Sequence, residues 1–247
     1  MPLTRLQAPV QHLTLYAAIL ALLLSGHETS ATEPYRTLSP SGDAPHPAVL
    51  LVPGCSGFVA TNGVNLYDER AGELQAAGYF VVFVDYLGHQ GNCGHISHSQ
   101  VGEEILEAAT WARAQAGVDA GRLSVIGWSY GGGGVLAALA AMPPGQPMFV
   151  KAVMYYPDCR GAKPWSAAGI SALMLMGAID EVARPAACDT VVKGAPLNSL
   201  RAILYPNAFH GFDSRGLPER AEYPFGTIGY NAEAAKASWA TVLDFLR

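Results

Sequence analysis

Largely apolar runs of four to eight residues recur along this chain, and segments with helical character separate them. Runs of this length are typical of strands that are buried on both faces of a parallel sheet. They lie at residues 48–52, 79–86, 123–126, 150–156, 171–176 and 200–205. The predicted helices lie at residues 65–77, 100–115, 135–141, 184–193 and 230–246. The alternation predicts an α/β fold with a mostly parallel, doubly wound sheet and helices on both faces.

The N-terminal segment differs from the rest of the chain. Arg5 and His12 precede an apolar run at residues 13–24, and small and polar residues follow it. The run is too short to span a bilayer comfortably and has the layout of a secretory signal peptide, with a cleavage site after Ala31. We therefore predict a signal peptide at residues 1–31, a single domain at residues 32–247, and a secreted or periplasmic protein without membrane attachment after cleavage. An uncleaved anchor or a docked apolar helix is the alternative.

Composition narrows the functional classes. The formal net charge is -5, and charged residues make up 14% of the chain without forming a basic cluster. This balance argues against a nucleic-acid partner. The four cysteines include no C-x-x-C pair, so we expect no metal site.

The sequence Gly127-x-Ser129-x-Gly131 follows the predicted strand at residues 123–126 and precedes a helix. In this context a G-x-S-x-G motif predicts a nucleophile elbow, in which a sharp turn presents the serine hydroxyl above the end of the sheet. A glycine-rich nucleotide loop is the alternative, but the lysine that a P-loop requires does not follow the glycines.

A serine nucleophile needs a base and an acid that orients the base. In hydrolases with a nucleophile elbow these residues follow the serine in the order acid, then histidine. Asp180 and His210 have this order, and each comes just after a predicted strand. Asp158, which follows the preceding strand, is the main alternative for the acid, and Asp85, Asp189 and Asp213 are weaker alternatives.

The oxyanion hole requires two backbone N–H groups. One belongs to the residue after the nucleophile, which is Tyr130. The other is expected in the turn after the first core strand, at Cys55. The thiol of Cys55 as a nucleophile is the rival interpretation, although no histidine is placed by pattern to activate it.

Four segments together resemble the dienelactone hydrolase family of the α/β-hydrolase fold. They are the turn at residues 52–57, the elbow at residues 127–132, the strand exit at residues 177–180 and the segment at residues 205–213. The C-terminal helix is also similar to that of the family. The chain differs from the enzyme that names the family, which has cysteine in place of Ser129 and glutamate in place of Cys55.

The resemblance implies a carboxylic ester hydrolase that needs no cofactor and acts on a small-molecule ester or lactone. Ser129 would attack, His210 would act as the base and Asp180 would orient it. The loops at residues 87–99 and 161–168 are too short to form a large lid. A lipase, polyester hydrolase or peptidase of the same fold is the alternative within enzymes, and a non-catalytic ligand-binding relative is the alternative from another class.

The cysteines lie after predicted strands. We expect the strands of each pair to be neighbours, with their carboxyl ends on the same rim of the sheet. We predict the disulfides Cys159–Cys188 and Cys55–Cys93, out of three possible pairings. Paired cysteines near Asp180 also resemble a pattern in exported members of the family. Four reduced thiols would be expected if the N-terminal segment were an anchor of a cytoplasmic protein.

Overall fold

The computed structural model describes residues 33–88 and 91–247. The predicted signal peptide at residues 1–31 lies outside the described residues. None of the described helices is long and apolar enough to cross a membrane.

A seven-stranded sheet with the order β1-β3-β2-β4-β5-β6-β7 forms the centre of the domain. Its strands are β1 (Arg36–Leu38), β2 (His46–Val52), β3 (Phe80–Phe83), β4 (Val118–Trp128), β5 (Lys151–Tyr155), β6 (Ser171–Gly177) and β7 (Leu200–Tyr205). All neighbouring pairs are parallel except β1 with β3. The predicted mostly parallel sheet is therefore confirmed, with one short antiparallel strand at its edge.

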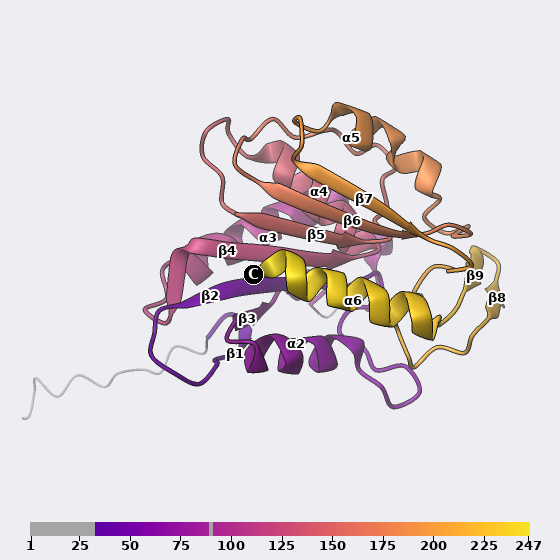
Figure 1. Ribbon diagram of the computed structural model, residues 1–247, viewed down its shortest axis with the longest axis horizontal. Coiled ribbons are helices and arrows are strands. Elements are labelled where there is room, and N and C mark those ends of the chain that lie inside the picture. Colours follow the sequence, from indigo (N-terminus) through magenta and orange to yellow (C-terminus); the bar gives the residue numbers. More distant parts are fainter. Residues whose placement is uncertain (1–32, 89–90) are drawn as a thin grey trace, which may run out of the picture. The chain divides into compact units, whose positions relative to one another are not determined.

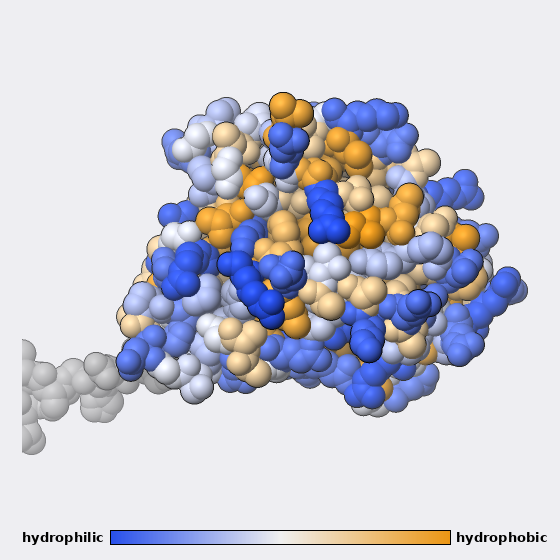
Figure 2. Space-filling model, in the orientation of Figure 1, coloured by the Kyte–Doolittle hydropathy of each residue, from blue (hydrophilic) through white to orange (hydrophobic). Residues whose placement is uncertain are grey.

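Helices cover both faces of this sheet (Figure 1). Helices α2 (Leu66–Ala76) and α6 (Ala232–Leu246) pack on one face, whereas α3 (His98–Arg113) and α4 (Tyr130–Ala141) pack on the other. Successive side chains of a strand point to opposite faces, so Leu50 belongs to the core under α3 and α4 and Leu51 to the core under α2 and α6. Figure 2 shows that hydrophobic side chains also gather at the surface above α6, over strands β5 to β7.

Local sequence signals set the starts of the long helices. Asn65 accepts hydrogen bonds from two backbone N–H groups at the start of α2, and Asn231 does so from one at the start of α6. Ser97 and Gln100 form a reciprocal capping box at the start of α3. These side chains satisfy N–H groups that a helix end leaves without partners, which explains why the helix starts were close to those predicted.

Several segments differ from the prediction. Strand β4 begins at Val118 and helix α4 at Tyr130, each five residues before the predicted start. Strand β3 ends at Phe83, and a turn begins at Tyr86, to which we expected the strand to continue. The helix expected at residues 184–193 is a short 3₁₀ segment, η2 (Pro185–Cys188), followed by α5 (Asp189–Gly194). A hairpin of β8 (Ala221–Tyr223) and β9 (Gly226–Ile228) was not predicted, because strands of three residues carry no readable alternation.

Candidate active site

The backbone at Ser129 has an unusual conformation, with φ 50° and ψ -115°. A non-glycine residue rarely has a positive φ, and such strain persists only where neighbours hold the backbone in place. Here the Ser129 N–H donates to the carbonyl of Tyr155 at 2.9 Å, and the Ser129 carbonyl accepts from the N–H groups of Gly133 and Asp158, each at 3.0 Å. The turn between β4 and α4 is therefore held from both sides, as a nucleophile elbow requires.

The glycines of the motif are required by close backbone approach. A Cβ atom on Gly131 would lie 2.2 Å from the carbonyl oxygen of Pro53, and one on Gly127 would lie 2.7 Å from the carbonyl oxygen of Gly131. Any side chain at either position would push α4 away from the ends of β2 and β4. The G-x-S-x-G spacing thus follows from packing.

Ser129, His210 and Asp180 form a continuous chain of contacts. His210 Nε2 lies 2.8 Å from Ser129 Oγ, and His210 Nδ1 lies 2.8 Å from Asp180 Oδ2. The other carboxylate oxygen of Asp180 accepts the backbone N–H groups of Val182 and Ala183, both at 2.8 Å. Because both oxygens have partners and the side chain is fully buried, Asp180 is fixed in the orientation that faces His210.

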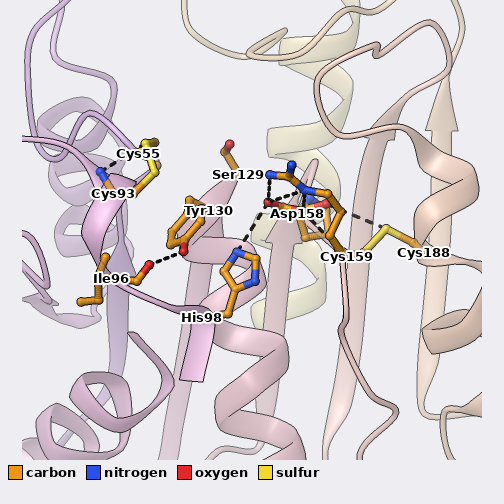
Figure 3. A network of polar contacts seen from close by, with 12 residues as sticks. Cys55, Cys93, Ile96, His98, Ser129, Tyr130, Asp158, Cys159 and Cys188 are labelled. Atoms are coloured by element: carbon orange, nitrogen blue, oxygen red, sulfur yellow. Dashed lines mark hydrogen bonds and ion pairs between the residues drawn. A yellow bond between two sulfur atoms is a disulfide. The ribbon is translucent and has the colours of Figure 1, made fainter. Parts of the chain in front are cut away.

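Asp158, the alternative acid, points into a different cluster (Figure 3). The Arg160 guanidinium donates to both of its oxygens, at 2.6 to 3.1 Å, and His98 Nε2 lies 3.6 Å away. Burial acts to raise the pKa of Asp158, but the hydrogen bonds from Arg160 and the nearby His98 leave it below the ordinary value. The structure therefore brings Asp180, and not Asp158, to the imidazole of His210.

The turn after β2 is fixed by two tyrosine side chains. The Gly54 N–H donates to Tyr67 Oη at 2.9 Å, and Tyr86 Oη donates to the Gly54 carbonyl at 3.0 Å. The N–H of Cys55 belongs to the same planar peptide as that carbonyl and points in the opposite direction. Tyr86 thereby sets the direction of one of the two N–H groups predicted for the oxyanion hole.

Ser129, His210, Cys55 and Tyr130 all line one cavity of about 610 Å³, which we call the central cavity. Its volume lies within the range of small-molecule sites. The residues of the predicted constellation thus meet at one place, at the carboxyl ends of the parallel strands where ligands bind in open α/β sheets.

Residues 36–247 match the profile of the Dienelactone hydrolase family. The chain belongs to this family. The resemblance inferred from the four sequence segments is confirmed.

Solved structures with the same architecture include known hydrolases. A putative dienelactone hydrolase from Klebsiella pneumoniae subsp. pneumoniae has a TM-score of 0.65 and 20% identity, covering 85% of this chain and 90% of that one. A thermophilic esterase from Thermogutta terrifontis has a TM-score of 0.60 and 13% identity, covering 85% of this chain and 87% of the esterase. These similarities establish the α/β-hydrolase fold.

Among curated proteins, a probable dipeptidyl-aminopeptidase B from Coccidioides posadasii is 29% identical over 119 residues. The match covers 45% of this chain and 13% of the peptidase. This chain therefore corresponds to only a small part of the peptidase.

Both predicted disulfides are present, and they lie on either side of Ser129 (Figure 3). Cys55 pairs with Cys93, and Cys159 pairs with Cys188. The first bridge ties the turn after β2 to the loop before α3, and the second ties the exit of β5 to η2. Because the sulfur of Cys55 is bonded to Cys93, the interpretation of Cys55 as a thiol nucleophile is wrong.

A buried carboxylate beneath the site was not assigned a role from the sequence. Asp213, only 2% exposed, accepts hydrogen bonds from Trp128 Nε1 at 2.9 Å and from Tyr156 Oη at 2.6 Å. Trp128 precedes Ser129, and the centroid of the Tyr156 ring lies 4.6 Å from that of the His210 ring. Burial raises the pKa of Asp213, whereas Arg70 and the two hydrogen bonds act against this rise. Asp213 thus links the elbow to the loop that carries His210.

We predict that Asp213→Ala lowers the free energy of unfolding by about 2–5 kcal/mol, because it leaves two buried donors without an acceptor. Denaturant unfolding measures the change. Asp244→Ala removes an exposed carboxylate from α6 and should change the free energy by less than about 0.5 kcal/mol. Equal stability of the two variants would show that the buried hydrogen bonds of Asp213 contribute nothing.

Proposed function

We propose that this protein is a serine hydrolase that cleaves a small carboxylic ester or lactone through an acyl-enzyme. The observation that carries the proposal is the unbroken contact chain from Ser129 through His210 to Asp180 at the central cavity. Membership of the Dienelactone hydrolase family and the esterase among the structural neighbours support the same reaction class.

In the proposed reaction, Ser129 Oγ attacks the ester carbonyl while His210 Nε2 takes the hydroxyl proton. The N–H groups of Cys55 and Tyr130 stabilise the negative charge that develops on the carbonyl oxygen. His210 then gives the proton to the leaving alcohol oxygen as the C–O bond breaks. Water, deprotonated by His210, attacks the acyl carbonyl, the bond from that carbon to Ser129 Oγ breaks, and His210 returns the proton to Ser129 Oγ as the acid leaves. Asp180 keeps the imidazole in the tautomer that these transfers need.

The peptidase and ligand-binding alternatives receive less support. The fungal peptidase matches this chain over a small part of its length. In a protein that only binds a ligand, selection would not preserve a serine with a strained backbone in contact with a buried His–Asp pair. Activity assays on matched ester and amide substrates separate these alternatives, because a peptidase cleaves both and a ligand-binding protein cleaves neither.

We also propose that the protein functions outside the cytoplasm. The structure contains two disulfides, and disulfides persist mainly in oxidising compartments. This agrees with removal of residues 1–31 as a signal peptide.

Ser129→Ala should lower kcat/KM for a chromogenic short-chain ester by about 10⁴-fold or more, because the attacking oxygen is lost. The free energy of unfolding should stay close to that of the parent protein. A serine-directed phosphonate should label the parent in a 1:1 ratio and leave the variant unlabelled. Activity within tenfold of the parent would contradict the assignment.

Asp180→Asn should lower kcat by about 10³–10⁴-fold, because an amide no longer favours the tautomer in which His210 can accept a proton. Asp158→Asn is the matched control, since Asp158 contacts Arg160 and not His210. Its effect should be less than tenfold. Steady-state kinetics of both variants decide the question, and the opposite ranking would assign the acid to the exit of β5.

The exported protein should begin near Thr32. N-terminal sequencing of protein recovered from a periplasmic or culture fraction measures the start directly. Recovery of soluble protein that retains Met1 would be inconsistent with a cleaved signal peptide.

A further inference from the structure

The β8–β9 hairpin at residues 221–228 is attached to both loops that carry the proposed acid and base. Ile228 forms a β-bridge with His210, and the Gly229 N–H donates to the His210 carbonyl at 3.0 Å. On the other side, the N–H and hydroxyl of Thr227 donate to Glu181, the residue after Asp180, at 3.3 and 3.1 Å. The hairpin therefore has a defined position relative to the catalytic groups.

The hairpin holds two aromatic side chains at the surface of the central cavity. Tyr223 and Phe225 stack with ring centroids 5.2 Å apart and planes 14° apart. They are 45% and 61% exposed, yet both line the central cavity together with Leu217 and Ile228. A stacked aromatic pair in this position offers a flat apolar surface to a bound molecule rather than to the protein core.

The order of strands places this surface on one side of the nucleophile. Ser129 follows β4, and the oxyanion turn at Cys55 follows β2, which is next to β4. Asp180 and His210 follow β6 and β7, on the opposite side of β4. The hairpin is joined to these two exits, and Figure 1 shows it beyond the ends of the strands. It thus lies on the side of His210, away from the turn that carries Cys55.

This position determines which part of an ester the hairpin would contact. His210 gives its proton to the oxygen of the leaving alcohol, so that oxygen must lie next to the imidazole. The substituent on this oxygen extends away from the carbonyl carbon, on the side where the hairpin is attached. The acyl substituent is on the other bond of the carbonyl carbon.

We propose that the β8–β9 hairpin binds the alcohol portion of the ester, and that Tyr223 and Phe225 select alcohols that carry an aryl group. The inference rests on the proposed esterase function and names the substrate class of the same site.

Two ester series test the assignment. In the first series the acyl group is always acetyl and the alcohol is methyl or benzyl. In the second the alcohol is always ethyl and the acid is acetic or phenylacetic. In Tyr223→Ala and Phe225→Ala, the ratio of kcat/KM for benzyl over methyl acetate should fall about tenfold, mainly through KM, because the aromatic contact is lost. The ratio within the acid series should stay within twofold of the parent.

Leu197→Ala is the control. It removes an apolar side chain that is 92% exposed and does not line the central cavity, so it should change neither ratio.

Binding to the inactive Ser129→Ala protein separates this inference from the esterase proposal. Fluorescence titration with 2-naphthylmethanol should give a Kd that is several-fold higher when Phe225→Ala is added. Three outcomes would overturn the hairpin assignment. The substitutions could change the ratio in the acid series, they could lower kcat/KM equally for benzyl and methyl acetate, or they could leave the Kd of the alcohol unchanged. If the parent protein hydrolysed no ester while naphthylmethanol still bound through Phe225, the proposed function would fail and the binding surface would stand.

Discussion

The strained backbone at Ser129 is the constraint on which the arrangement of this domain depends. A positive φ at a serine is unfavourable on its own, so the surrounding contacts must maintain it. They come from three directions: the hydrogen bonds with Tyr155 and Asp158 at the exit of β5, the hydrogen bond from Gly133 in the first turn of α4, and the close approach of Gly131 to the carbonyl of Pro53 after β2. The strands β2, β4 and β5 must therefore be neighbours, as the sheet order shows. The position of the hydroxyl is a property of the whole sheet centre.

The site around the serine is braced by buried polar groups that lie below the cavity. Tyr67 and Tyr86 hold the two polar atoms of Gly54, and Asp213 holds Trp128 and Tyr156. Burial raises the pKa of both tyrosines that contact Gly54, so they stay neutral and can serve as hydrogen-bonding groups. Each of the buried polar groups named here has its partner in the same region, so removing one of them leaves another buried group without a partner.

The two disulfides differ in position: Cys55 and Cys93 line the central cavity, whereas Cys159 and Cys188 are buried in the core beside it. One joins the turn with the proposed oxyanion donor Cys55 to the loop at Cys93, and the other connects the exit of β5 to the segment after Asp180. Loops at the carboxyl edge of a parallel sheet have few packing contacts of their own. Covalent bridges here restrict the loops that carry the polar groups of the site, while the sheet and helices stabilise the domain.

The sequence by itself determined the class of fold and the sharp turn at Ser129, and it led to the proposed roles of Ser129, Asp180 and His210. Buried parallel strands are nearly continuous apolar runs, and the glycines at positions 127 and 131 are dictated by close backbone approach, so both features are local and readable. The disulfide pairs could also be predicted, because neighbouring strands end at the same edge. The strand position of Asp180 already favoured it over Asp158 as the acid, but the tertiary structure alone showed the contacts, in which Asp180 faces His210 and Asp158 pairs with Arg160. It alone showed the hairpin at residues 221–228, whose strands are too short for a periodic signal, and the Asp213 network, which joins residues 85 positions apart in the chain. Contacts of that kind depend on how the elements pack, and no local pattern in the sequence records them.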